Sequence, residues 1–218
     1  MNVIVEQAIY EMNLLANNVP DGKHVVTGDI RKLSAKLYRE IKDKTIDNVF
    51  FLCEELLEQH SWGLGVIAFD WAYRVKAQYN EDTYDIFYSW LKKYVRGRGD
   101  CDDFCKHAFG ELLRRQKTIF SKIKKWTKDE DFWVRRASAV ILIPAILHDD
   151  YDGIDPLIIS DLLMSDKHDL VQKGYGWMLK SFSQVDKDAV TNYLIDNYVQ
   201  MPRTAYRYAL EKYDKETR

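Results

Sequence analysis

Three carboxylates follow a glycine-rich stretch near the middle of the chain. Gly97-Arg98-Gly99 precedes Asp100, Asp102 and Asp103. Acidic residues at a helix start cap backbone N–H groups and suit the helix dipole, which accounts for one or two of the three. A remaining carboxylate among cations stays ionised and can stabilise positive charge that develops on a bound substrate. This segment is therefore the first candidate for chemistry.

Two adjacent arginines, Arg135 and Arg136, follow Phe132-Trp133. On a helix, neighbouring side chains diverge by about 100°, so one can lie along the apolar boundary while the other points outward. An arginine there can hold a phosphate with two parallel hydrogen bonds. The alternatives are two solvent-exposed arginines or a salt bridge to a neighbouring repeat.

A third candidate is the run Gly174-Tyr175-Gly176-Trp177. Each glycine inside a helix costs about 1 kcal/mol relative to alanine, so something must approach the backbone closely. That neighbour is an adjacent helix or a ligand backbone. Trp177 is accordingly a core residue or a platform on which a base could stack.

Charge is unevenly distributed along the chain. The net charge is -2, yet Arg114–Lys128 holds seven basic residues and no acidic one, with Lys124 and Lys125 at adjacent positions. Over Lys92–Arg136 fourteen basic residues stand against seven acidic ones. Such polarity is typical of a protein with one phosphate-facing surface. A solvated helix face and loop is the alternative.

The elements that must position these residues are helices. Apolar residues recur at three- and four-residue spacing, as at Ile30, Leu33, Leu37 and Ile41, and strand signals are nearly absent. Turn-forming residues interrupt the pattern at Pro20–Gly22, Gly97–Gly99, Asp149–Gly153 and Met201–Pro202. The chain is predicted to be all-α.

The helices also look repeated. Val134–Ala137 and Val171–Gly174 lie 37 residues apart, and each follows an acidic turn, Lys128–Asp131 or Asp166–Asp169, that supplies N-cap candidates. A spacing that drifts between about 30 and 40 is typical of degenerate HEAT-like repeats. We therefore predict one domain over residues 1–218, a right-handed superhelix (α-α solenoid) whose concave face binds something extended.

Several classes of protein are excluded. The sequence has no P-loop, no GxSxG, no HExxH and no dinucleotide fingerprint. Cys53, Cys101 and Cys105 are too few for a disulfide framework, and His107 alone could not complete a zinc site beside them. We expect no metal and no cofactor. Without an apolar stretch long enough to span a bilayer or an N-terminal signal architecture, a cytoplasmic monomer is expected.

Five segments together resemble the AlkD-like DNA alkylation repair family, bacterial DNA glycosylases built from HEAT-like repeats. The resemblance extends from about residue 25 to the C-terminus and rests on Thr27–Lys36, Asp100–Asp103, Trp133–Ala137, Gln172–Leu179 and Met201–Ala205. It implies excision of cationic N3- and N7-alkylated purines by hydrolysis of the N-glycosidic bond. It also implies a concave basic surface that holds double-stranded DNA.

The resemblance assigns roles to individual residues. In a Trp-Asp-x-x-Asp motif the final carboxylate falls on Asp103, the first on Asp100 and the leading tryptophan on Gly99; the family's arginine and later tryptophan fall on Arg136 and Trp177. Asp103 and Asp100 are thus the expected catalytic residues. The expected DNA-binding residues are Arg136, Trp177, Arg135, Lys173, Lys124, Lys125 and Arg98.

Two other functions remain open. Gly99 in place of the motif's tryptophan favours a non-catalytic relative that binds damaged or branched DNA structures. The helical repeats could also form a protein-interaction scaffold, with the basic residues scattered over several faces. The expected partner is double-stranded DNA, including alkylated DNA, and not a membrane.

Overall fold

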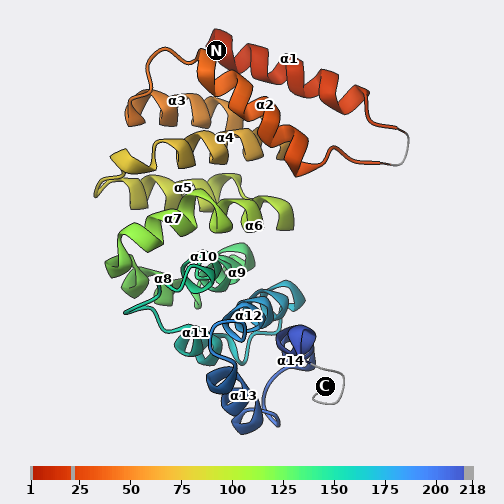
Figure 1. Cartoon of the computed structure of the whole chain (residues 1–218), viewed down its shortest axis with the longest axis vertical. Coiled ribbons are helices and arrows are strands. Elements are labelled where there is room, and N and C mark those ends of the chain that lie inside the picture. The colour runs from red at the N-terminus through yellow and green to blue at the C-terminus, as the bar shows by residue number, and fades with distance from the viewer. Residues whose placement is uncertain (1, 21–22, 214–218) are drawn as a thin grey trace. The chain divides into compact units, whose positions relative to one another are not determined.

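A computed structural model describes residues 2–20 and 23–213, and within them the chain is helical with no β-strand. The prediction of an all-α protein is confirmed. The chain divides into two compact units, Met1–Tyr94 and Val95–Arg218. Figure 1 labels the helices of both units.

The first unit is built around α4. Its apolar residues leave no polar face, and every residue from Gly63 to Ala72 is buried because α2 and α3 both pack on it. Aromatic rings extend this core to α5, where Phe87 and Trp90 contact Phe50 of α3 at 5.4 and 5.3 Å between ring centroids. The helices are α1 Val3–Asn17, α2 Thr27–Glu40, α3 Ile46–Leu57, α4 Trp62–Arg74 and α5 Thr83–Tyr94, with a 3₁₀ turn at Lys76–Gln78.

One buried carboxylate lies within this core. Asp70 of α4 accepts hydrogen bonds from Ser34 Oγ at 2.5 Å and Arg74 Nε at 2.8 Å, and Arg31 Nη1 lies 3.4 Å away. Trp71 Nε1 donates to the Ser34 carbonyl at 3.2 Å. A buried charge is tolerated only when it is paired in this way. The cluster therefore joins α2 to α4.

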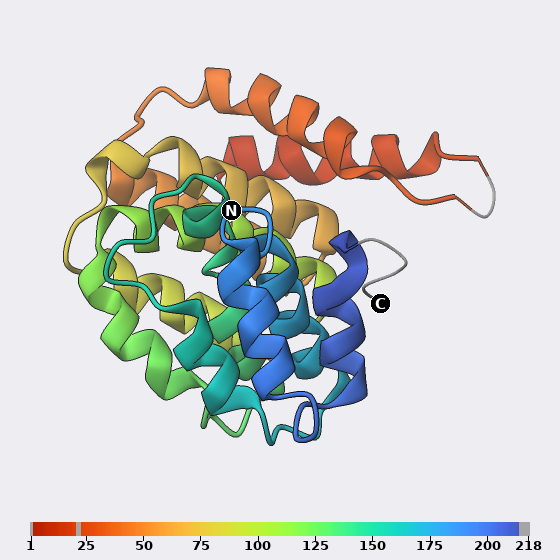
Figure 2. The same ribbon diagram turned by 60° about the horizontal axis from the view of Figure 1, so that its bottom comes forward.

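The second unit is organised around α12, which contacts α9, α10, α11 and α14. Helices α12 and α14 lie side by side in both ribbon views (Figures 1 and 2). The helices are α6 Arg98–Lys106, α7 Ala108–Arg115, α8 Phe120–Trp126, α9 Phe132–Val140, α10 Ile143–Leu147, α11 Pro156–Leu163, α12 Asp169–Phe182, α13 Lys187–Asp196 and α14 Arg203–Ala209, with 3₁₀ turns at Lys117–Ile119 and Leu210–Lys212.

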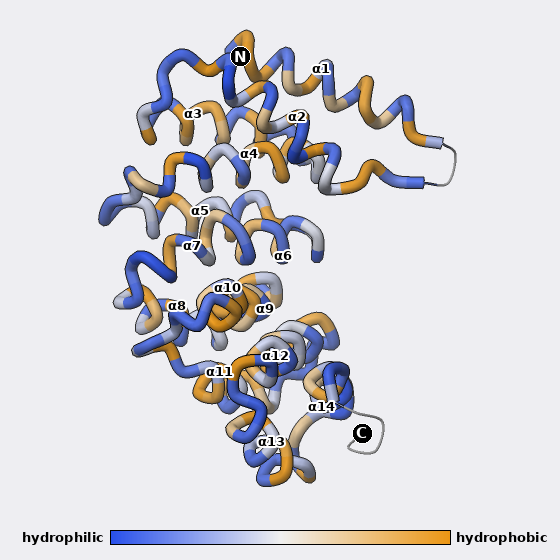
Figure 3. Tube along the Cα trace, viewed as in Figure 1, coloured by the Kyte–Doolittle hydropathy of each residue, from blue (hydrophilic) through white to orange (hydrophobic). Residues whose placement is uncertain are grey.

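Apolar and polar residues alternate along the helices of each unit, as Figure 3 shows. In α9, for example, Val134, Ala137 and Val140 are fully buried, whereas Arg135 remains partly exposed. This is the amphipathic pattern expected of helices that bury one face. None of the described helices combines the length and apolar character needed to cross a membrane.

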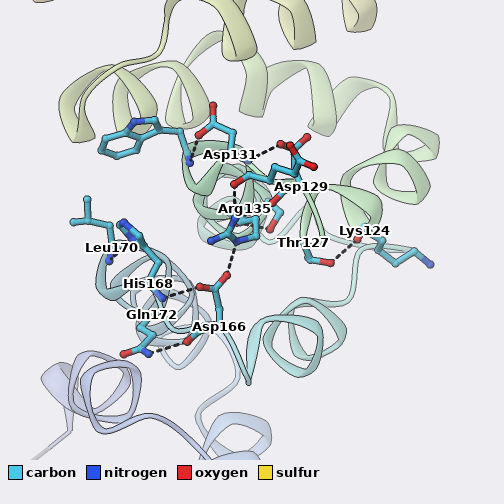
Figure 4. A network of polar contacts seen from close by, with 12 residues as sticks. Lys124, Thr127, Asp129, Asp131, Arg135, Asp166, His168, Leu170 and Gln172 are labelled. Carbon is cyan, nitrogen blue, oxygen red and sulfur yellow. Dashed lines mark hydrogen bonds and ion pairs between the residues drawn. The ribbon is translucent and has the colours of Figure 1, made fainter.

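At two helix starts 37 residues apart, side chains at equivalent positions cap the helix in the same pattern (Figure 4). Asp131 caps α9 by accepting from the Trp133 N–H at 2.8 Å, and His168 Nδ1 caps α12 by accepting from the Leu170 N–H at 3.3 Å. One step earlier, Asp129 accepts from the Asp131 N–H at 2.9 Å and Asp166 from the His168 N–H at 2.8 Å. The acidic turns supply the N-caps, as predicted from the sequence.

One of the predicted breaks lies partly inside a helix, and another is only partly described. Gly97–Gly99 was expected to be a turn, but α6 begins at Arg98, so Gly99 lies in the first helical turn and only Gly97 precedes the helix. In Pro20–Gly22, residues 21 and 22 lie outside the described residues. The breaks at Asp149–Gly153 and Met201–Pro202 separate helices as predicted.

Candidate functional site

Asp100, the first of the three carboxylates, lies in the first turn of α6 and folds back onto the backbone that precedes the helix. Asp100 Oδ2 accepts from the Arg96 N–H at 3.3 Å, an interaction at the third helical position like that of the acidic half of a capping box. Burial raises the Asp100 pKa, and the backbone N–H groups of Arg96 and Gly97 oppose that rise. A side chain at Gly97 would begin 3.3 Å from Asp100 Oδ2, so the glycine leaves room for the cap. Asp100 thus closes the helix start.

Asp102, on the next turn of α6, pairs with Arg136 of α9. Arg136 Nε donates to Asp102 Oδ1 and Nη2 to Asp102 Oδ2, both at 2.9 Å, and Nη1 donates to the Leu170 carbonyl of α12. A Cβ on Gly174 would lie 3.1 Å from Arg136 Cγ, so this glycine admits the arginine between α9 and α12. One side chain therefore ties three helices together.

This pairing corrects the expected role of Arg136 as an open phosphate ligand. Its side chain is only 3% exposed and its guanidinium is held by Asp102, so a phosphate could reach it only if the pair broke. Burial raises the Asp102 pKa, and the positive charges of Arg136, Arg98 and Lys106 oppose the rise. The close approach predicted at Gly174 is that of a neighbouring helix.

A lysine that the sequence did not single out links α6, the helix of Asp103, to α12, the helix of Trp177. Lys106 lies one turn after Asp103 on α6, and its Nζ is 4.7 Å from the ring centroid of Trp177 on α12. Asp103 and Trp177 are both half-buried, and Lys106 is exposed. The three-residue spacing from Asp103 places Lys106 on the same side of the helix, which is the one signal that could have found it.

Arg135 lies at the centre of the network in Figure 4. Its Nε donates to Asp166 Oδ2 at 2.6 Å, and its Nη1 donates to the carbonyls of Asp129 and Glu130 at 2.8 and 2.9 Å. The Asp166 side chain is 8% exposed and that of Arg135 20%. Of the alternatives for this residue, the geometry matches the salt bridge to a neighbouring repeat, because Arg135 joins the turn before α9 to the turn before α12.

The basic segment Arg114–Lys128 is partly neutralised. Arg114 and Arg115 donate to the buried carboxylate of Glu111 at 2.9 and 2.8 Å. Lys117 lies 2.7 Å from Asp150, and its hydrogen bond lowers the Asp150 pKa. Arg114 Nε also lies 3.3 Å from Asp150 Oδ2, so α7 is held to the turn after α10. The first half of the segment therefore contributes less positive surface than its composition suggests.

Two lysines in the second half of the segment lie at the surface. Lys125 is exposed and Lys124 half-exposed on α8, with the Lys124 ammonium 5.4 Å from the Phe120 ring centroid. Two further candidate residues lie elsewhere in the unit. Arg98 is exposed in the first turn of α6, and Lys173 of α12 pairs with Asp169 at 2.6 Å. Among the described residues no three acidic, histidine or cysteine side chains gather as metal ligands would.

Comparison with known proteins adds two findings. A family model described as "DNA alkylation repair enzyme" matches residues 24–213. The structure is similar to that of a predicted DNA alkylation repair enzyme from Enterococcus faecalis, with a TM-score of 0.68 and 15% identity over 97% of this chain and 95% of that chain. At that identity the similarity shows a shared helical-repeat fold. No functionally curated protein matches the chain.

Proposed function

The chain belongs to the DNA alkylation repair enzyme family, and from that premise we propose that it binds double-stranded DNA and excises cationic N3- or N7-alkylated purines. The family assignment supports a role in DNA repair. The reaction is hydrolysis of the N-glycosidic bond. Water adds to the anomeric carbon, the purine leaves as a neutral base, and one proton is released.

The observation that supports this proposal is the contact of the Lys106 ammonium with the Trp177 ring, together with the position of Asp103 one helical turn before Lys106 on α6. A carboxylate and an aromatic ring are the two groups that excision of a cationic base requires. The alkylated purine already bears positive charge, so its departure needs little acid catalysis and leaves an oxocarbenium-like sugar. A fixed carboxylate stabilises that sugar and can orient or deprotonate the attacking water.

The other two carboxylates of α6 have positioning roles. Asp100 closes the helix start, and Asp102 holds Arg136, which in turn fixes α6 against α9 and α12. We assign the catalytic role to Asp103 because the final carboxylate of the Trp-Asp-x-x-Asp motif falls on it. Trp177 is the surface against which the base lies.

DNA binding is assigned to cations that remain accessible. Lys124 and Lys125 on α8 and Arg98 at the start of α6 would contact phosphates. Arg135 acts indirectly, because it sets the position of the turn that precedes α12.

A second function is favoured by two specific observations. Gly99, which the AlkD-like motif would fill with tryptophan, is an exposed position without a side chain, and Lys106 already covers part of the Trp177 ring. Both reduce the aromatic surface open to a cationic base. A protein of this kind would bind DNA structures without releasing bases.

The deciding experiment measures base release from duplex DNA that carries N7-methylguanine or N3-methyladenine. We expect release by the wild type and a loss of about 10²–10³-fold in Asp103→Asn, the effect of removing one electrostatic stabiliser. Asp100→Asn is the matched control, and it should retain most of the activity because its amide oxygen can still accept from Arg96. DNA binding is measured in parallel by anisotropy.

The other outcomes are equally informative. Salt-sensitive DNA binding without release by any variant would favour the structure-binding function. Release that survives in Asp103→Asn would remove the catalytic assignment. A wild type that binds no DNA would contradict both functions.

A further inference from the structure

We propose that a cleft between α12 and α14 is a second nucleic-acid site, which takes the phosphodiester backbone of a single strand. The inference rests on the proposed DNA-binding function and adds to it a surface on which Lys173 is one of the expected DNA-binding residues, whereas Arg203, Arg207 and the tyrosines are not. The cleft has a volume of about 860 Å³ and is lined by Lys173, Arg203, Arg207, Tyr198 and Tyr206, among others.

The charges of the cleft favour an anion. Two carboxylates also line it, but Asp169 pairs with Lys173 at 2.6 Å and Glu211 pairs with Lys180 at 2.6 Å. Arg203 and Arg207 are exposed, and neither forms an ion pair with another residue of the described ranges. The positive charge of α14 is therefore left for a ligand.

Arg203 and Arg207 form an arginine fork, a pair of cations that can both contact one anion. They are four residues apart on α14, so their side chains lie on one face about one turn apart. Like charges at that spacing repel each other, and an anion between them removes the repulsion. A guanidinium carries five N–H donors, of which Arg203 uses one toward the Tyr198 hydroxyl at 3.0 Å.

The fork is held in a fixed place relative to α12. A Cβ on Gly176 would lie 2.6 Å from the Ala205 carbonyl oxygen and 2.7 Å from Tyr208 Cβ, so α14 rests directly on the backbone of α12. Ala205 is fully buried in this contact. Arg203 and Arg207, which flank Ala205 in sequence, are thereby held in place to line the cleft together with Asp169 and Lys173 of α12.

Aromatic rings beside the fork point to an unpaired strand. Arg203 lies 4.6 Å from the ring centroid of Tyr198, and Tyr198 meets Tyr206 edge to face at 5.4 Å. Cations that hold phosphates beside rings that stack on bases are the combination with which proteins bind single strands, because only unpaired bases expose their faces. A duplex would offer the same phosphates but keep its bases stacked internally.

The test uses the full chain and two labelled probes, an oligothymidine of about eight nucleotides and a blunt duplex. In Arg203→Gln/Arg207→Gln we expect oligothymidine affinity to fall about ten-fold and the salt slope of binding to fall by about 2, with a smaller effect on the duplex. Arg39→Gln/Lys42→Gln removes the same charge from exposed positions in the first unit and should change neither affinity by more than about two-fold. The melting temperature of every variant is measured to confirm folding.

Each outcome decides between the two proposals. Equal oligothymidine affinity in the fork variant and the wild type overturns the cleft, while duplex binding would still support the proposed function. Oligothymidine binding that depends on the fork, without any duplex binding, supports the cleft and contradicts the proposed function. If the wild type binds neither probe, both proposals fail.

Discussion

At the scale of single residues, arginines that look like phosphate ligands in the sequence serve the scaffold in the structure. Arg136 holds Asp102, Arg135 holds Asp166, and Arg114 shares Glu111 with its neighbour. Each carboxylate is at least half-buried, where an unpaired charge would be costly. The arginines are therefore required for stability whatever the protein binds.

Arg136→Met should lower the free energy of unfolding by about 3 kcal/mol, because it leaves the Asp102 carboxylate partly buried without its cation. Urea unfolding of Arg136→Met, Asp102→Asn and the double variant measures the coupling between the two side chains. The double variant should be more stable than the sum of the single losses predicts. Strict additivity would show that the pair contributes no coupling energy.

The raised pKa of Asp100 predicts a dependence of stability on pH. Because the folded-state pKa lies above the unfolded value, this group stabilises the fold below the unfolded pKa, and the contribution is lost as the pH rises through the folded pKa. Asp100→Asn cannot ionise, so its stability relative to wild type should improve between about pH 4 and about pH 7. Unfolding curves of both proteins at the two pH values measure this difference in stability. A difference that does not change with pH would contradict the raised pKa of Asp100.

At the scale of elements, two glycines set the spacing of the second unit. The missing side chain at Gly174 leaves room for the Arg136 side chain of α9, and the one at Gly176 leaves room for the backbone of α14. One neighbour of α12 is therefore a side chain and the other is backbone. The obstacle at Gly174 is a side chain, whereas at Gly176 it includes a carbonyl oxygen. A backbone atom in a packed helix moves aside for an added methyl group less readily than a flexible side chain does.

Gly176→Ala should therefore cost about 1–3 kcal/mol of stability through overpacking, although alanine is the better helix former. Gly174→Ala should cost less, because Arg136 can shift by a few tenths of an ångström. Gly28→Ala in α2 is the control, since a Cβ there meets nothing within 4 Å and the substitution should be neutral or slightly stabilising. Thermal unfolding of the three variants gives the order.

The elements were largely predictable from the sequence, and their contacts were not. The helical period and the acidic turns before α9 and α12 are local signals, and both predicted the structure correctly. Asp102 and Arg136 are 34 residues apart, and Lys106 can meet Trp177 because α6 and α12 both pack against α9. No local pattern encodes that packing, so the partners of the candidate residues could not be identified.

At the scale of the whole molecule, charge is used in two ways. The net charge of -2 hides a segment in which some cations are consumed by internal carboxylates and others remain on the surface. Only the second kind can contribute to a salt-dependent interaction with DNA.

Two double variants should separate these uses. Lys124→Gln/Lys125→Gln should lower the salt slope of duplex binding by about 2 with little change in melting temperature. Arg114→Gln/Arg115→Gln should destabilise the fold by about 1–3 kcal/mol, because Glu111 loses its partners, and leave the slope nearly unchanged. The reverse pattern would place the DNA surface on α7.

The Arg135 contact between repeats also makes the resistance of the second unit to a pulling force differ along its length. Arg135 reaches forward to Asp166, but the residue 37 positions later is Gln172, which reaches only back, to the Asp166 carbonyl at 2.8 Å. The next ion pair along the chain, between Lys180 and Glu211, has a carboxylate that is 46% exposed. Under a pulling force applied at the C-terminal end, we expect α14 to detach first and unfolding to stop at the turn that Arg135 holds.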